Sequence, residues 1–157
     1  MPKAKRKGRS EAKYESYCVR VEDCRPTYSF HLNDSKHFEG PYWEHLAVTF
    51  VGHLISPQRL KWHRLPLMFL GRRDEERILE QPNTSDWKPL NIGVLTLRRE
   101  RTEFLGSLPN DALWALLNAH LSGAFQIIHL HGRRERGRTE IRSVHFECEV
   151  DPEDLEL

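Results

Sequence analysis

Hydrophobic and polar side chains alternate along most of this chain, with the two-residue period of a half-buried β-strand. Early in the chain the alternation covers residues 17–21 and, after a turn that contains Pro26, residues 28–32. It resumes after the polar segment 33–41 and covers residues 46–54. We therefore expect two short strands, a loop and one long strand in this part of the chain.

The middle of the chain predicts a hairpin and then a less regular segment. A break at Pro57 follows the long strand, and a further alternation covers residues 65–69. The two runs predict a hairpin whose connection includes Trp62. The charged residues 74–80 predict a short helix, and residues 81–90, which contain two prolines, predict a loop that links two halves of one fold.

The second half of the chain predicts two further hairpins. Residues 92–97 and 101–105 are short strands around a tight turn that is rich in arginine. Residues 125–131 pair with residues 141–150 across a loop centred near Gly137. The sequence Arg-Arg-Glu-Arg stands at the tip of both hairpins. Because the flanking strands differ, we interpret this repetition as a coincidence rather than a duplication.

One amphipathic helix is predicted between these hairpins, over about residues 109–122. Pro109 falls in its first turn, where the missing N–H costs little, and Gly123 can end it in the left-handed conformation. Two residues near its start have side chains that can cap it, Ser107 and Asn110. Its apolar stripe has Trp114 beside it and consists of Leu113, Leu117 and Leu121.

Eight candidate strands and one helix predict a mostly β fold of the α+β class. We expect an antiparallel two-layer β-sandwich or a partly open barrel, with the helix over one face or end. The 157 residues match one ordinary domain, which buries roughly two-thirds of the surface of its unfolded chain. We expect the domain to cover residues 15–150, after a flexible basic arm (1–14) and before an acidic tail (151–157).

The net charge of +1 conceals a basic beginning and an acidic end of the chain. The three cysteines match neither a disulfide framework nor a paired zinc site, so we expect reduced thiols. No apolar run approaches the ~20 residues of a membrane helix, and the basic start lacks the apolar stretch of a secretory signal. We therefore predict a cytoplasmic protein without a membrane partner. The sequence does not determine its oligomeric state.

The final hairpin carries a candidate metal site. Its apolar residues are expected to face the interior, which aligns His129 with His145 on the opposite face. His131 shares that face, and Glu147 lies beside Ile127. Three converging imidazoles can hold a divalent ion and leave a position for a water molecule, which the metal activates as a nucleophile. The alternative is that these are exposed histidines on a solvated face of the sheet.

Arginines gather at the predicted hairpin tips and, with the basic arm, indicate a surface for an acidic partner. Because glutamates stand between them, the alternative is a soluble hairpin tip that discourages edge pairing. The candidate binding residues are Lys3, Lys5, Arg6, Lys7, Arg9, Arg98, Arg99, Arg133, Arg134 and Arg136.

The chain contains no glycine-rich phosphate loop, no Ser-His-Asp order and no serine elbow of the type Gly-x-Ser-x-Gly. It therefore identifies no catalytic residue and no cofactor, and an enzyme is the less favoured interpretation. We expect a non-catalytic binding or assembly module that engages an acidic partner, either nucleic acid or protein. The alternative is a metal-dependent, hydrolase-like enzyme centred on His129, His131 and His145.

Overall fold

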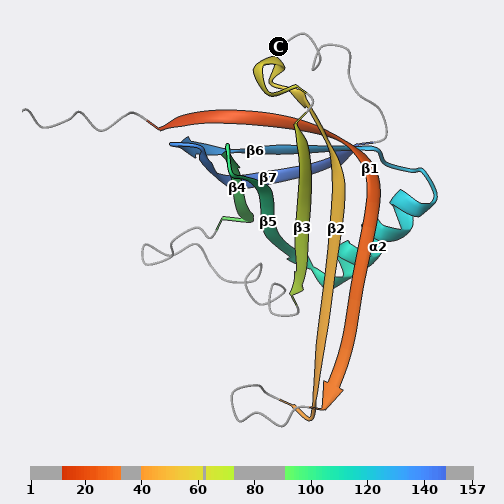
Figure 1. Cartoon of the computed structure of the whole chain (residues 1–157). Coiled ribbons are helices and arrows are strands. Elements are labelled where there is room, and N and C mark those ends of the chain that lie inside the picture. The colour runs from red at the N-terminus through yellow and green to blue at the C-terminus, as the bar shows by residue number, and fades with distance from the viewer. Residues whose placement is uncertain (1–11, 33–39, 62, 73–90, 148–157) are drawn as a thin grey trace, which may run out of the picture.

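The computed structural model describes residues 12–32, 40–61, 63–72 and 91–147 (Figure 1). In chain order the described elements are β1 (Lys13–Leu32), β2 (Tyr42–Ser56), the 3-10 turn η1 (Gln58–Leu60), β3 (Arg64–Arg72), β4 (Gly93–Arg98), β5 (Arg101–Pro109), α2 (Asn110–Leu121), β6 (Ile127–Glu135) and β7 (Arg138–Glu147). The mostly β fold with a single helix is confirmed for the described part of the chain. The predictions for Trp62 and for residues 74–80, 81–90 and 148–157 lie outside it.

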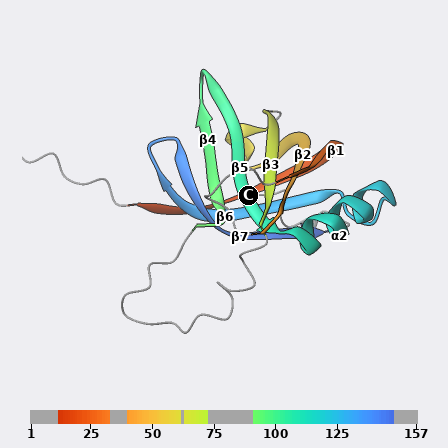
Figure 2. The ribbon, with the colours of Figure 1, turned by 90° about the horizontal axis from the view of Figure 1, so that it is seen from below.

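The seven described strands form one mixed sheet that curls into a ring (Figure 1 and Figure 2). The neighbours follow the order β1, β2, β3, β5, β4, β7, β6, and pairing of β6 with β1 closes the ring. All neighbouring strands are antiparallel except β3 and β5. We expected an antiparallel sheet throughout. β4 and β5 form an antiparallel hairpin, and β5 rather than β4 lies beside β3. β5 therefore runs parallel to β3.

β1 is one strand of 20 residues, whereas the alternation predicted two short strands with a turn at Pro26. Pro26 lies opposite Val48 in β2 and remains within the ladder. β6 pairs only with residues 13–20 of β1, so Pro26 stands where β1 has a neighbour on one side alone. Proline is tolerated at such an edge because its missing N–H breaks no bond to a second neighbour. Figure 1 shows this half of β1 projecting with β2 as a long two-stranded ribbon.

The interior of the ring is packed with aromatic rings. Phe50 is fully buried, and its ring centroid lies 6.0 Å from that of Phe69 and 5.5 Å from that of Phe125. Phe69 in turn lies 5.0 Å from Phe104. Edge-to-face and tilted pairs of this kind contribute about 0.5–1.5 kcal/mol each beyond the burial of their area.

Only part of the predicted leucine stripe of helix α2 packs on this interior. Leu113 and Leu117 are buried, but Leu121 in the last turn is 73% exposed. Gly123 follows with a φ of 75°, which confirms the left-handed end. Both predicted caps were wrong: the N-cap is Pro109 and has no side-chain bond, because Ser107 belongs to β5 and Asn110 is already the first helical residue. In the described ranges, no helix is long and apolar enough to cross a membrane.

Candidate functional site

The two arginine-rich hairpin tips lie side by side at one end of the ring. β4 pairs with β7, which places Thr96 opposite Arg138, and the backbone N–H of Leu97 donates to the carbonyl oxygen of Gly137 at 2.9 Å. The two Arg-Arg-Glu-Arg segments, 98–101 and 133–136, are therefore neighbours in space. Whatever the origin of the repetition, the strand order gives the two tips one common surface.

The strand register aligns one arginine from each of four adjacent strands on the outer face of the ring. Arg98 lies opposite Arg101, and Arg138 is a diagonal neighbour of Arg98 across the pair of β4 with β7. On the other side of β7, Arg133 is the diagonal neighbour of Arg138. Tyr14 in β1 lies directly opposite Arg133 and extends the row to a fifth strand. We call this row, Arg101, Arg98, Arg138 and Arg133, the arginine belt.

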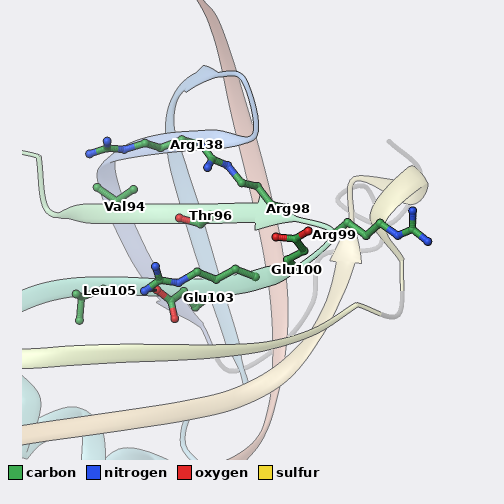
Figure 3. A pocket seen from close by; sticks show the side chains of 9 residues that line it. Val94, Thr96, Arg98, Arg99, Glu100, Glu103, Leu105 and Arg138 are labelled. Atoms are coloured by element: carbon green, nitrogen blue, oxygen red, sulfur yellow. Dashed lines mark ion pairs between the residues drawn. The ribbon is translucent and has the colours of Figure 1, made fainter.

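Two hollows follow the arginine belt. The larger, of about 650 Å³, is lined by Val94, Thr96, Arg98, Arg99, Glu100, Arg101, Glu103, Leu105 and Arg138 (Figure 3). The smaller, of about 280 Å³, is lined by Arg98, Arg133, Glu135, Arg136, Arg138 and Glu140. Because Arg98 and Arg138 line both, the hollows form one groove across the hairpin tips. Figure 3 shows Val94 and Leu105 at one end of the larger hollow and Arg99 pointing away from it.

The groove has an excess of positive charge. The segments 98–103 and 133–140 contain seven arginines and four glutamates. Glu103 forms an ion pair with Arg101, and Glu15 forms one with Arg134. The other five arginines are exposed and form no ion pair within the described ranges: Arg98, Arg99, Arg133, Arg136 and Arg138. These guanidinium groups remain available to an anionic partner.

Arg134 has a different role from Arg133, because it is part of a network that joins β1 to β6 and β7. Its Nη1 lies 3.1 Å from Glu15 Oε2, and Arg59 binds the other oxygen of the same carboxylate. Tyr17 donates its hydroxyl hydrogen to Glu15 Oε2 at 2.7 Å and lies 2.8 Å from Thr139 Oγ1. Of the predicted binding residues, Arg134 is thus engaged in holding the strands together.

The network shifts the pKa values of its two acidic members. Burial by itself raises the pKa of Glu15, but hydrogen bonds from Tyr17 and Arg59 and the charges of Arg59 and Arg134 outweigh it, so the pKa lies below its ordinary value. Burial, together with the neighbouring Glu15 carboxylate, raises the pKa of Tyr17 to about 12. Glu15 is therefore ionised and Tyr17 neutral at physiological pH.

The basic residues predicted in the arm, Lys3, Lys5, Arg6, Lys7 and Arg9, lie outside the described residues. The strand that follows them begins at Lys13, two residues before the expected start of the domain at residue 15, and Lys13 lies opposite Arg134. The chain therefore enters the fold at the end of the ring that carries the arginine belt.

The register predicted for the final hairpin is confirmed, since His129 lies opposite His145 and Ile127 opposite Glu147. The three histidines do not converge. His129 Nε2 lies 3.2 Å from Glu147 Oε2, whereas His131 Nδ1 lies 2.7 Å from the hydroxyl oxygen of Ser16 in β1. Among the described residues, no three His, Cys, Asp or Glu side chains are grouped so that they could hold one metal ion. Metal binding at these histidines stays a prediction.

Sequence reasoning missed the rings and apolar side chains beside the arginine belt. Tyr14 was assigned to the flexible arm, yet it is a strand residue whose ring stacks on His131 with centroids 5.9 Å apart. Residues 13–16 read Lys-Tyr-Glu-Ser and show no alternation of apolar and polar positions, so local pattern gave no signal for this earlier strand start. Val94 and Leu105 face each other within one hairpin, but their place in a groove with Arg138 depends on the pairing of β4 with β7, which no local pattern indicated.

Comparison of the chain with protein-family models, with curated protein sequences and with solved structures finds no match in any of the three. Inference about function therefore starts from the arginine belt and its groove.

Proposed function

We propose that this protein is a non-catalytic binding module that engages an acidic partner through the arginine belt. The observation that carries the proposal is the pairing of β4 with β7, which joins two arginine-rich hairpin tips into one groove. Five exposed arginines of this groove have no ion-pair partner within the described part of the chain. Like charges gathered on one surface repel one another, and a bound counter-charge relieves that repulsion.

The chemistry of the belt supports binding rather than catalysis. A guanidinium group keeps its proton throughout the physiological pH range, so it binds anions but does not act as a general base. The basic arm would add to the same positive surface, because the described chain begins beside Arg134.

We place the protein in the cytoplasm as part of this proposal, on the basis of its cysteine pattern.

The proposal is tested by measuring the affinity of the full chain for a labelled heparin oligosaccharide over a series of salt concentrations. The double variant Arg98→Ala/Arg138→Ala removes two belt arginines. We expect it to lower the affinity about ten-fold or more at low salt and to reduce the slope of log affinity against log salt by roughly one to two.

The matched control is Arg20→Ala/Arg64→Ala, which removes the same charge from exposed strand positions. Arg20 lies opposite Ile127 at the other end of β6, and Arg64 begins β3. We expect this control to bind heparin nearly as the unchanged protein does. Failure of the unchanged protein to bind heparin at 50 mM salt, or equal losses in both double variants, would refute the proposal.

The second candidate function is the metal-dependent, hydrolase-like enzyme. The observation in its favour is the cross-strand pair of His129 with His145, with the Glu147 carboxylate 3.2 Å from His129. Elemental analysis of the protein purified without a tag tests it. Stoichiometric zinc, manganese or iron that is lost in His129→Ala would support the enzyme. A metal-free protein whose thermal stability is the same in chelator would remove this candidate.

A further inference from the structure

We infer that the partner of the arginine belt is single-stranded nucleic acid, which lies across β5, β4, β7, β6 and β1 with its phosphates on the arginines and its bases on side chains at the two ends of the row. This inference rests on the proposed function and specifies its partner. Four gaps between five neighbouring strands, at about 4.8 Å each, give the row a length of roughly 19 Å.

The cations of the belt are all arginines. From residue 91 to residue 147 the chain contains eight arginines and no lysine. Arginine offers a planar fork that binds two phosphate oxygens at once, and its flat face stacks on nucleobases. A surface that only attracts polyanions has no need of this geometry, because lysine supplies the same charge.

An aromatic platform lies at the β1 end of the belt. The Tyr14 side chain is 59% exposed, and its ring stacks on that of His131 at an interplanar angle of 15°. The guanidinium carbon of Arg142 lies 5.8 Å from the centroid of the Tyr14 ring. Tyr14 is also directly opposite Arg133. A base that stacks on these rings would therefore keep its phosphate within reach of the belt.

An apolar floor lies at the β5 end of the belt. Leu105 is 48% exposed and lies opposite Val94 on β4 and beside Met68 on β3, which is 40% exposed. Val94 and Leu105 line the larger hollow together with Arg98 and Arg138 (Figure 3). A flat base or a sugar gains by covering such a floor, whereas the carboxylates of an acidic peptide do not.

The glutamates of the groove favour nucleic acid over an acidic protein as the partner. Glu100, Glu135 and Glu140 line the hollows between the arginines. They repel carboxylates, and an Asp- or Glu-rich peptide has few side-chain donors to offer them. Bases carry amino groups, such as N4 of cytosine, that donate to carboxylates. A mixed row of Arg and Glu therefore suits a ligand with both phosphates and N–H donors.

A single strand fits better than a duplex. The rings of Tyr14 and His131 and the floor at Leu105 act on the flat faces of bases, which a duplex covers with the neighbouring base pairs. The belt also lies on the outer surface of the ring, where strands bring side chains to a shallow groove rather than a deep cleft. Unpaired bases can turn toward such a surface.

The test is fluorescence anisotropy of the full chain with four labelled probes: a mixed-sequence single-stranded RNA of 20 nucleotides, the corresponding single-stranded DNA, its duplex, and a polyglutamate peptide. We expect at least one single strand to bind at least ten-fold more tightly than both the duplex and the peptide. Tyr14→Ala should weaken single-strand binding roughly ten-fold. Tyr14→Phe, which keeps the ring, should restore it.

The control for Tyr14→Ala is Tyr42→Ala, which removes a tyrosine of similar exposure, 53%, from the projecting ribbon. Equal effects of the two substitutions would overturn the stacking argument and with it the inference. If heparin binds but the duplex or polyglutamate equals the single strand, the inference is wrong and the proposed function stands. If none of these polyanions binds, both are wrong.

Discussion

Tyr17 donates its buried hydroxyl to Glu15 Oε2 over 2.7 Å, two residues away along the same face of β1. Because Tyr17 has given its one hydrogen to Glu15, the hydroxyl of Thr139 in β7 donates to the Tyr17 oxygen, at 2.8 Å. Arg134 in β6 binds the same carboxylate. Glu15 and Tyr17 together thus connect β1 to both β6 and β7.

We predict that Tyr17→Phe lowers the free energy of unfolding by about 1–3 kcal/mol. The substitution keeps the ring but leaves the Thr139 hydroxyl, which is 1% exposed, without its acceptor. Urea unfolding followed by circular dichroism measures the change. Tyr14→Phe is the control, because its exposed hydroxyl should contribute less than about 0.5 kcal/mol. Equal stabilities of the two variants would contradict the role of the network.

The lowered pKa of Glu15 predicts that the protein loses stability in acid. The pKa of Glu15 is lower in the folded protein than its ordinary value of 4.5, so its contribution is present above that pH and is lost as the pH falls below it. Glu15→Gln should therefore reduce the free energy of unfolding by about 1–3 kcal/mol at pH 7 and by progressively less toward pH 3. Urea titrations of both proteins between pH 3 and pH 7 test this, and a difference that does not change with pH would contradict it.

The raised pKa of Tyr17 predicts that the protein also loses stability in alkali. Burial raises the pKa of Tyr17 from 10 to about 12, so the folded state retains the phenolic proton at a pH where the unfolded state releases it. The contribution of Tyr17 is complete below about pH 10 and is lost as the pH rises toward 12. The difference in stability between the unchanged protein and Tyr17→Phe should therefore shrink between pH 9 and pH 11. A constant difference over this range would show that Tyr17 ionises normally.

The leucine stripe shows how far local pattern predicts packing. Together with Pro109 and Gly123 at its ends, the four-residue spacing predicted the position of α2 to within a residue at each end. It did not predict that the helix extends past the ring it covers, which leaves Leu121 exposed while Leu113 is buried. Periodicity defines a face of a helix, but how much of that face is covered depends on where the neighbouring strands end.

Leu113 and Leu121 therefore provide a matched pair of substitutions. Leu113→Ala should lower the free energy of unfolding by about 2–5 kcal/mol, because it leaves a cavity in the core. Leu121→Ala should change it by less than about 0.5 kcal/mol. Thermal and urea unfolding of both variants measure the difference. Similar losses at the two positions would mean that Leu121 is covered in solution.

The candidate site shows a similar division between local and distant information. Strict alternation predicted the pairing of His129 with His145, because both belong to one hairpin. The arginine belt depends on β4 pairing with β7, whose partners Thr96 and Arg138 are separated by a helix and two strands along the chain. No local pattern specifies which hairpins become neighbours. The sequence therefore indicated arginines at two tips but not their common groove.

Removal of residues 1–11 should weaken heparin binding and make it less dependent on salt. This segment carries five lysines and arginines against one glutamate and joins the fold beside Arg134. Each phosphate-like contact that is lost should reduce the salt slope by roughly 0.7–0.9. The truncated chain should unfold at the same urea concentration as the full chain. An unchanged salt slope would show that the arm takes no part in binding.

The closure of the ring also has a consequence for how the protein is made. Lys13 pairs with Arg134, so β1, the first of the described strands in chain order, meets its second partner only after about 120 further residues have been synthesised. Until then, the backbone of the first strand remains open along one side and can pair with another nascent chain. Slow translation or high expression should therefore increase aggregation, and the chains that aggregate should be unfinished ones rather than completed, folded protein.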